Sequence, residues 1–460
     1  MFDVAPWFHH QQVARRIQFI CSGCGAPSSK WSGRCSRCGE WNCIDEHSPG
    51  PHRPYGEQAC PLAEVPLGDT ASTSTGIAEL DRVLGGGLVN GSVTLLGGEP
   101  GIGKSTLALQ IAATRAARAD RVLYCSAEES PGQVAGRAGR LGLSGGDLWL
   151  SATTDVDALC AEVARLEPAM VVVDSIQTLE VEGTNGGSTA RVREATTRLV
   201  QLAKQRGLVV VVIGQVTKDG ELAGPKSLEH LVDTVLSFEG DRHHSLRFLR
   251  SVKHRFGPTG EVGLFDMGPT GLSPVADPSA VFMADRATGV PGSVVVPVIE
   301  GHRPMLVEAQ ALVCPKAMAL PRRTAQGLGQ RRVSMLAAVL EQRGRLELQE
   351  SDVHTSTVGG VRVAEPAADL GVLVAIASAR MARVVPDDLV AVGEVGLVGE
   401  VRRVADLSRR LNEAERLGFR TAMVPAAAEV TTGLELVRVT SVKDALGWLA
   451  ARRLLSATAA

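Results

Sequence analysis

The sequence has few aromatic residues and no long apolar run. Phe, Trp and Tyr make up 3% of the 460 residues while apolar residues make up 44%, so aliphatic side chains must build the cores. No run reaches the roughly 18 apolar residues of a membrane-spanning helix, and residues 1–20 lack the apolar stretch of a signal peptide. We therefore expect a soluble, cytoplasmic protein without a membrane partner.

Net charge is also nearly absent. The formal net charge is −2, so any surface that binds nucleic acid must be a local patch on an otherwise balanced molecule. Composition thus neither requires nor excludes DNA as a ligand. A chain of this length is expected to form about two or three domains, each with its own core.

Cysteine is rare outside one short segment. Of nine cysteines, four form two Cys-x-x-Cys pairs, Cys21 with Cys24 and Cys35 with Cys38. Two such pairs on short turns converge readily on a tetrahedral zinc ion. The alternative, cysteines that only pack, is disfavoured because so small a segment has little else to hold it folded. We predict a structural zinc site with no open coordination position.

Composition and periodicity divide the chain into five segments. Residues 1–17 carry no usable pattern and form an N-terminal extension, and residues 18–45 hold the cysteine pairs. Residues 46–75 have the Pro- and Gly-rich composition of a linker. Residues 76–272 and 280–455 each alternate strand-like and helix-like segments. Two α/β domains preceded by a small zinc module are therefore expected.

Short apolar runs alternate with helix-length segments in the first α/β region, a pattern typical of a mostly parallel sheet with helices on both faces. The later runs 233–239, 245–252 and 261–266 have no helices between them and predict an antiparallel extension. In the second region we expect strands near 293–299, 306–313 and 391–398, and helices near 330–343, 366–380 and 405–417.

The segment GEPGIGKS, from Gly98 to Ser105, matches the phosphate-loop pattern between an apolar strand and a helix. Backbone N–H groups of such a loop surround the β-phosphate, Lys104 neutralises phosphate oxygens, and Ser105 ligates Mg²⁺. An ordinary Gly-rich turn is the alternative, which the strand and helix on either side disfavour. The predicted ATP-binding residues are Gly98, Glu99, Pro100, Gly101, Ile102, Gly103, Lys104, Ser105 and Thr106.

Polar residues at three strand ends complete the predicted hydrolytic site. Asp174 ends the run MVVVD and is the expected partner of Mg²⁺, unless it only caps the strand. Glu128 and Glu129 follow the run RVLYCSA, and we favour Glu128 as the group that polarises water, against an exposed acidic turn. Gln215 ends LVVVVIG and would sense the γ-phosphate, although a simple polar strand end fits equally well.

The chain resembles the bacterial RadA (Sms) family of DNA repair proteins over about residues 17–455. The resemblance rests on the segments TGIAELDRVLGGGLVNGSVTLLGGEPGIGKST, LVDTVLSFEGDRHHSLRFLRSVKHRFG and GGVRVAEPAADL. It implies a RecA-type ATPase core and a hexameric ring of identical subunits. It also implies ATP-driven branch migration of recombination intermediates.

The family's Lys-Asn-Arg-Phe-Gly motif stands here as KHRFG at residues 253–257. The resemblance implies that Lys253 and Arg255 reach across a subunit interface to the γ-phosphate. A solvated basic strand is the alternative. Members of the family usually carry His where Gln215 stands, so the coupling role is expected with a different side chain. By similarity to RecA-type loops, the following segment, with Lys218 and Lys226, would contact the DNA backbone.

The C-terminal region resembles the proteolytic domain of Lon in GSVVVPVIEGHRPMLVEAQALV and GEVGLVGEVRRV. Lon requires a Ser nucleophile and a Lys, and the matching positions here are Ala367 and Ser408. Neither residue can perform that chemistry. We expect a role in ring assembly and a basic surface instead. Candidate DNA contacts, against ordinary solvated charge, are Arg322, Arg323, Arg331 and Arg332.

The sequence therefore predicts a DNA-dependent ATPase that translocates on single strands and branch-migrates recombination intermediates. Its expected ligands are ATP, Mg²⁺, Zn²⁺, and single-stranded and branched DNA. A RecA-type recombinase is the expected protein partner. One alternative is an ATP-switched adaptor that loads recombinase onto DNA. A less favoured alternative is an ATP-dependent protease.

Overall fold

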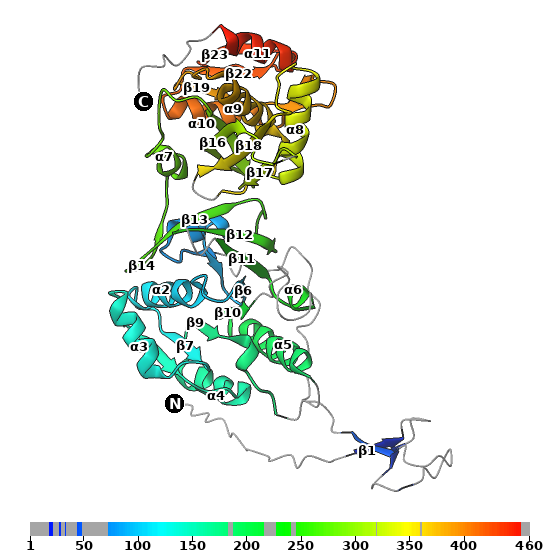
Figure 1. Cartoon of the computed structure of the whole chain (residues 1–460). Helices are drawn as coiled ribbons and strands as arrows, with labels where there is room; N and C mark the ends of the chain where they lie inside the picture. Colours follow the sequence, from blue (N-terminus) through cyan, green and yellow to red (C-terminus); the bar gives the residue numbers. More distant parts are fainter. Residues whose placement is uncertain are drawn as a thin grey trace, which may run out of the picture. The chain divides into compact units, whose positions relative to one another are not determined.

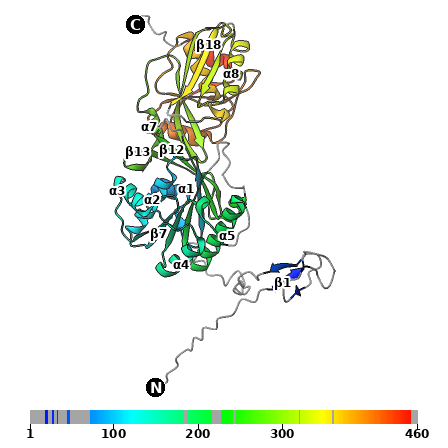
Figure 2. The ribbon, with the colours of Figure 1, turned by 60° about the horizontal axis from the view of Figure 1, so that its bottom comes forward.

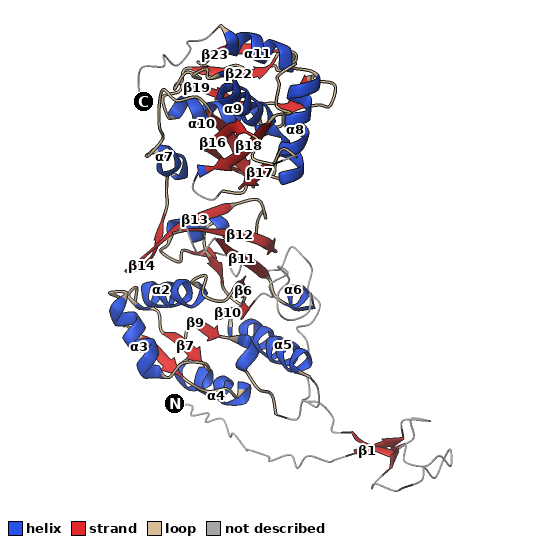
Figure 3. Cartoon of the chain, viewed as in Figure 1, coloured by secondary structure: helices blue, strands red, loops and turns tan. Residues whose placement is uncertain are grey.

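A computed structural model describes two units, Met1–Gly68 and Asp69–Ala460. The described residues are 18–21, 27–28, 33, 44–47, 72–182, 187–215, 227–240, 245–318, 320–358 and 361–451. Figure 3 shows both units by secondary structure. None of the helices in these ranges combines the length and the apolarity needed to cross a bilayer.

The first unit contains a small antiparallel sheet, labelled at β1 in Figure 1. Its strands are β1 (Gln18–Cys21), β2 (Pro27–Ser28) and β3 (Ile44–His47), with β1 in the centre. Cys21 ends β1, but its side chain lies outside the described residues. The other three predicted zinc ligands, Cys24, Cys35 and Cys38, lie outside them entirely.

A sheet of nine strands organises the N-terminal half of the second unit, in the order β14-β13-β12-β11-β6-β10-β9-β7-β8. Neighbouring strands from β8 through to β11 are parallel, and those from β11 to β14 are antiparallel. The strands are β6 (Val93–Gly98), β7 (Val122–Ser126), β8 (Leu148–Ser151), β9 (Met170–Asp174), β10 (Val209–Gln215), β11 (Thr234–Gly240), β12 (Leu246–His254), β13 (Val262–Gly268) and β14 (Gly271–Pro274).

Helices cover both faces of this sheet, which confirms the predicted fold class. One hydrophobic core lies between the sheet and the helices α1 (Ala78–Val83), α2 (Lys104–Ala116) and α3 (Pro131–Arg140). A second hydrophobic core lies between the other face of the sheet and the helices α4 (Val156–Leu166), α5 (Ser188–Arg206) and α6 (Ser227–Leu231). Figure 2 shows α1, α2 and α3 on one side of the strands and α5 on the other.

Side chains of the central strands alternate between these two cores. In β10, Val209, Val211 and Ile213 enter the core under α2, while Val210 and Val212 enter the core under α5. A strand buried on both faces must be apolar at every position. This requirement explains why its sequence is a continuous Val and Ile run.

The three later runs form an antiparallel ladder, as predicted. The run 233–239 forms β11, which pairs in parallel with β6 and antiparallel with β12. The two later runs form β12 and β13, antiparallel as expected. The prediction placed no elements between α3 and β9, where the structure has β8 and α4.

A second sheet, of seven strands in the order β17-β18-β16-β15-β19-β22-β23, forms the C-terminal half of the unit. Its strands are β15 (Ser293–Glu300), β16 (Arg303–Pro315), β17 (Arg323–Gln326), β18 (Ser351–Thr357), β19 (Leu389–Ala391), β22 (Thr421–Pro425) and β23 (Glu435–Val439). The helices are α7 (Pro278–Met283), α8 (Gln330–Gln342), α9 (Asp369–Met381), α10 (Leu407–Arg416) and α11 (Val442–Ala450). α8, α9 and α11 pack on one core of this sheet and α10 on the other.

The strand expected near 391–398 is wrong. The chain leaves β19 at Ala391 and turns through a short hairpin of β20 (Glu394–Val395) and β21 (Val401–Arg402). Gly399 adopts a φ of 89°, which suits a turn and not a strand. The apolar residues that suggested a strand, Leu397 and Val398, are exposed at the tip of the hairpin.

Candidate nucleotide site

The phosphate loop joins the end of β6 at Gly98 to the start of α2 at Lys104. Gly101 and Gly103 have φ angles of 80° and 114°, in the left-handed region that glycine adopts without strain. A Cβ on Gly103 would also lie 2.4 Å from Met267 Cε. These glycines curl the loop over the first turn of α2, where free N–H groups and the helix dipole favour a phosphate.

Lys104 is buried at the base of the loop, with 6% of its surface exposed. Its Nζ donates to the carbonyl oxygens of Gly98 at 2.8 Å and Glu99 at 2.9 Å. Burial lowers the pKa of Lys104, and the negative charges of Asp174 and Glu128 oppose that shift. A bound triphosphate would supply the anionic partner that this desolvated ammonium requires.

Asp174 ends β9 and is also buried. The hydroxyl of Tyr124, on β7, donates to Asp174 Oδ2 at 2.7 Å. Burial and then the neighbouring Asp174 charge raise the pKa of Tyr124 well above its ordinary value. Tyr124 therefore stays neutral and orients the carboxylate, which suits a residue predicted to hold Mg²⁺.

The structure separates the two glutamates that follow β7. Glu128 accepts a hydrogen bond from Ser175 Oγ at 2.7 Å, beside Asp174. Glu129 instead forms an ion pair with Arg137 on α3. Glu128 is therefore the glutamate held against the end of β9, and its role as the water-polarising group stays a prediction.

Gln215 is the last residue of β10 and lies level with Gly98 of β6 in the parallel register. The carboxyl ends of parallel strands meet at one edge of the sheet, where ligands of α/β proteins bind. The structure thus gathers Lys104, Asp174, Glu128 and Gln215 around the start of α2. Ser105 and Thr106, in the first turn of α2, are both partly exposed. The segment after Gln215, with Lys218 and Lys226, lies outside the described residues.

Lys253 and Arg255 lie at the end of β12, toward the side of the sheet where the parallel strands begin. Lys253 is paired with Val235 of β11, which in turn lies level with Leu95 of β6. Three residues of strand toward Gly98 span roughly 10 Å, and the two strand spacings from β12 to β6 add about 10 Å sideways. The structure therefore does not bring this pair to the phosphate loop of its own chain.

Both cations of this pair have partners near the start of β11. Arg255 donates to Asp233 Oδ1 at 2.8 Å, and Lys253 Nζ donates to the carbonyl oxygens of Glu229 at 2.6 Å and Val232 at 2.8 Å. Burial lowers the pKa of Lys253, and the Arg255 charge lowers it further. Arg255 remains 46% exposed, so its side chain is accessible from outside the subunit.

Three contributors to these sites were missed from the sequence: Tyr124, Ser175 and Asp233. Asp233 had a usable signal in the sequence, because it is an acid within the apolar run LVDTV. In the structure it is buried and accepts hydrogen bonds from Val93 N and from Arg255. Tyr124 lies on β7, and no local sequence pattern gives the position of that strand in the sheet. Its contact with Asp174 follows only from the pairing of β7 with β9.

The C-terminal positions that match the Lon dyad hold no catalytic pair. Ala367 is buried in the short helix η5 (Pro366–Ala368), and Ser408 lies on α10. An alanine methyl cannot act as a nucleophile, and serine cannot replace lysine as its base.

Two of the four arginines proposed for DNA contact have carboxylate partners within the subunit. Arg323 pairs with Glu341 and has 14% of its side chain exposed. Arg332 pairs with Asp369 at the start of α9. The other two members of the group are exposed. Any phosphate contact in this region is therefore better assigned to those two.

Comparison with known proteins gives two family models and a set of curated relatives. The model described as an AAA domain matches residues 61–221, and that described as a rubredoxin metal binding domain matches residues 19–46. The DNA repair protein RadA of Pseudomonas aeruginosa is 46% identical over 447 residues, covering 94% of this chain and 98% of that protein.

The DNA repair protein RadA of Halalkalibacterium halodurans is 44% identical over 449 residues, covering 94% of this chain and 98% of that protein. Among solved structures, one ATPase domain matches 45% of this chain and 93% of its own, with 16% identity and a TM-score of 0.41. That structural similarity is too low to support a functional argument.

Proposed function

This chain belongs to the RadA family of DNA repair proteins, and from that premise we propose that it is a ring-forming ATPase motor that translocates on single-stranded DNA and branch-migrates recombination intermediates. Family membership supports a DNA repair protein with an ATPase domain. The finer proposal depends on how the ATPase sheet distributes its charged residues.

The separation of Lys253 and Arg255 from the phosphate loop of the same chain is the observation that carries this proposal. A cation that assists phosphoryl transfer must reach the γ-phosphate. Since this pair lies two strands away from β6 and toward the amino ends of the parallel strands, we assign it to the phosphate bound by a neighbouring subunit. Repeating that contact around a closed ring gives each subunit one nucleotide and one neighbour's pair of cations.

Within one such interface, each group has a separate task. Lys104 and the loop N–H groups bind the phosphates, while Ser105 and Asp174 would hold Mg²⁺, which would supply charge neutralisation for the transferred phosphate. Glu128 orients and polarises the attacking water. Gln215, level with Gly98, responds to loss of the γ-phosphate and passes that change to the segment after β10.

DNA is the proposed substrate of that segment. Lys218 and Lys226 would neutralise backbone phosphates, so binding should weaken with salt and show little sequence preference. A RecA-type recombinase is the proposed protein partner. The four cysteines Cys21, Cys24, Cys35 and Cys38 would hold the Zn²⁺ that stabilises the N-terminal module.

Subunit mixing tests the shared site directly. Chains with Lys104→Ala and chains with Lys253→Ala should each lose ATPase activity. A mixed ring contains interfaces in which one subunit retains Lys104 and its neighbour retains Lys253. We expect the mixture to recover activity above either parent, measured as phosphate release. Absence of any recovery in rings shown to contain both chains would contradict the shared site.

The matched control is Lys316→Ala, which removes a lysine of the C-terminal region paired with Glu350 on the surface. It should leave ATPase activity unchanged. Strand displacement on a three-stranded junction, without recombinase, separates the motor from an adaptor. A motor drives displacement as ATP is hydrolysed, whereas an adaptor that uses nucleotide only as a switch gives none.

A further inference from the structure

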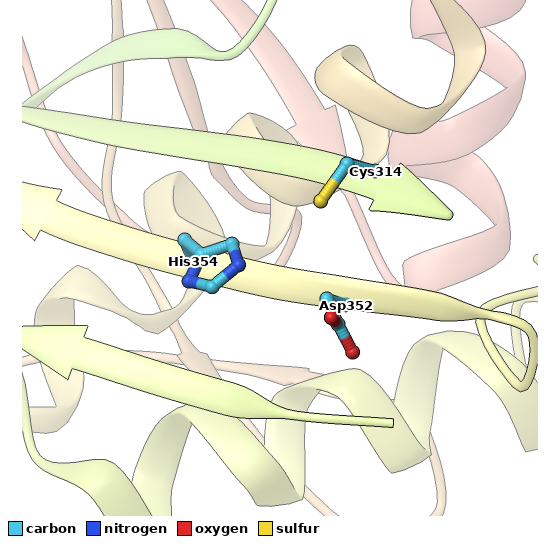
Figure 4. A group of neighbouring side chains, drawn as sticks. All are labelled: Cys314, Asp352 and His354. Atoms are coloured by element: carbon cyan, nitrogen blue, oxygen red, sulfur yellow. The ribbon is translucent and has the colours of Figure 1, made fainter. Parts of the chain in front are cut away.

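Three metal-ligating side chains that belong to neither predicted metal site lie together on the C-terminal sheet. Cys314 is on β16, and Asp352 and His354 are on the neighbouring strand β18. One ligand atom from each of the three lies within 4.8 Å of the others. Figure 4 shows Cys314 on β16 and both His354 and Asp352 on β18.

Strand register explains why these residues meet. Cys314 lies directly opposite Asp352 in the antiparallel pair, and Leu312 lies opposite His354. Side chains two residues apart on a strand share one face, so Cys314 and His354 are diagonal neighbours on the same face. Val313 and Val353 point to the other face and pack in the core. The three polar side chains therefore occupy the face of this strand pair that the core does not use.

Two of the three candidate ligands are held in place by groups behind them. Asp352 accepts the backbone N–H of Arg322 at 2.7 Å and of Ala317 at 3.3 Å, which fixes its carboxylate. His354 Nδ1 lies 2.6 Å from the hydroxyl of Thr324. That contact occupies one ring nitrogen and leaves Nε2 for a metal, an arrangement common among metal-binding histidines.

A cavity of about 590 Å³ reaches the cluster at one of its three members. Its lining includes His354, together with Thr324 and Leu312 from the flanking strands. Water and ions can therefore reach the histidine from the cavity side. A metal bound by three protein ligands keeps one coordination position open, and a cavity provides space for the water that fills it.

We propose that Cys314 Sγ, the Asp352 carboxylate and His354 Nε2 form a second zinc site, with its fourth position open to the cavity. A thiolate, an imidazole and a carboxylate are the ligand types that zinc combines. Tetrahedral bonds of about 2.0–2.3 Å place ligand atoms roughly 3.3–3.7 Å apart. The three ligand atoms lie within 4.8 Å of one another, so binding would draw them together by about 1 Å. Binding releases the thiol proton of Cys314 to solvent.

Metal counting on the full chain tests this site. Unsubstituted protein, Cys314→Ser and His354→Ala are equilibrated against the same zinc buffer, and zinc per chain is measured by mass spectrometry. Each variant should hold one zinc fewer per chain than the unsubstituted protein. The matched control is Cys160→Ser, which removes another free, partly exposed cysteine and should leave the zinc content unchanged. Because the readout is a difference, it does not depend on occupancy of the N-terminal module.

Cobalt provides an independent readout. In a background with Cys21, Cys24, Cys35 and Cys38 all replaced by Ser, titration with Co²⁺ should still produce a thiolate-to-cobalt charge-transfer band, and adding Cys314→Ser should remove it. Equal zinc content in all the chains, or a cobalt band that survives Cys314→Ser, overturns the proposal. Circular dichroism of each variant establishes that it remains folded, so that a lost metal is not a lost fold.

Discussion

At the scale of single residues, the nucleotide site depends on ionisable groups held in buried positions. Lys104 donates to two loop carbonyls, and the carboxylate of Asp174 is held by a tyrosine hydroxyl. Charges in such positions are poorly solvated, so a nearby opposite charge has a large effect on them. These buried charges therefore favour an anion beside Lys104 and a cation beside Asp174.

Replacing Lys104 with Ala should lower ATP turnover by about two orders of magnitude or more, because one phosphate-binding charge is lost at the transition state. Stability should change little, since removing a desolvated charge offsets the loss of two hydrogen bonds to carbonyls. We expect the melting temperature to stay within about 4 °C of the parent, the shift produced by roughly 1 kcal/mol. Phosphate release and differential scanning calorimetry measure the two effects. Unchanged turnover would refute the assignment of the phosphate loop.

Tyr124 should make the folded state sensitive to alkaline pH. Its pKa is raised well above the ordinary value of about 10 by burial and by Asp174. Above pH 10 the unfolded chain releases this proton and the folded chain retains it, so stability falls as pH rises. Tyr124→Phe should remove this contribution to the loss of stability above pH 10. At neutral pH it should lower the free energy of unfolding by about 1–3 kcal/mol, because a hydrogen bond to a charged group is lost.

Urea denaturation of Tyr124→Phe and the parent, from neutral pH to just above pH 10, measures both quantities. The stability difference between the two proteins should narrow toward the alkaline end. A difference that is constant with pH would mean that Tyr124 has the same pKa in the folded and unfolded states.

At the scale of elements, the sequence was most informative where a strand is buried on both faces. β9 and β10 are apolar runs up to their last residues, so the polar ends Asp174 and Gln215 stood out. β8 was missed because its burial is mixed, with Trp149 exposed, and the run gives no clear alternation. Contacts between strands, such as Tyr124 with Asp174, were not predictable, because lateral strand order is not encoded in local pattern.

The N-terminus of α3 offers an element-level prediction. Ser130 accepts from Gln133 N, and the Gln133 side chain accepts from Ser130 N, forming a capping box. Ser130→Ala should cost about 1 kcal/mol, because one N–H in the first helical turn loses its acceptor. Ser334→Ala, at an exposed position within α8, is the control and should cost no more than about 0.5 kcal/mol. Equal costs in chemical denaturation would argue against the cap.

At the scale of the whole molecule, the ATPase sheet and the C-terminal sheet are joined by a buried ion pair. Arg303 at the start of β16 pairs with Glu79 on α1, and their side chains are 8% and 3% exposed. Glu79 also accepts from Leu264 N at 2.9 Å, and Arg303 donates to the Ala276 carbonyl at 2.7 Å. The surrounding cluster contains apolar residues of both sheets. Movement of one sheet against the other would therefore expose these charges without partners.

Breaking this pair should destabilise the chain strongly. Arg303→Ala leaves the buried Glu79 with Arg82, at 3.5 Å, and the Leu264 N–H as its remaining partners, at a cost of about 3 kcal/mol. Arg416→Ala removes an exposed pair with Asp277 and should cost at most about 1 kcal/mol. Urea unfolding followed by circular dichroism compares them. Similar costs for the two variants would show that the buried pair does not hold the two sheets together.

The distance of Lys253 and Arg255 from the phosphate loop of their own chain has a kinetic consequence. In the proposed ring, Lys253 and Arg255 of one copy meet the triphosphate bound by its neighbour, so a solitary copy lacks that pair at its own phosphate loop. Turnover per chain is then not a constant of the molecule, but rises with the concentration at which copies meet. Dilution alone would switch the protein off, without any inhibitor or covalent change.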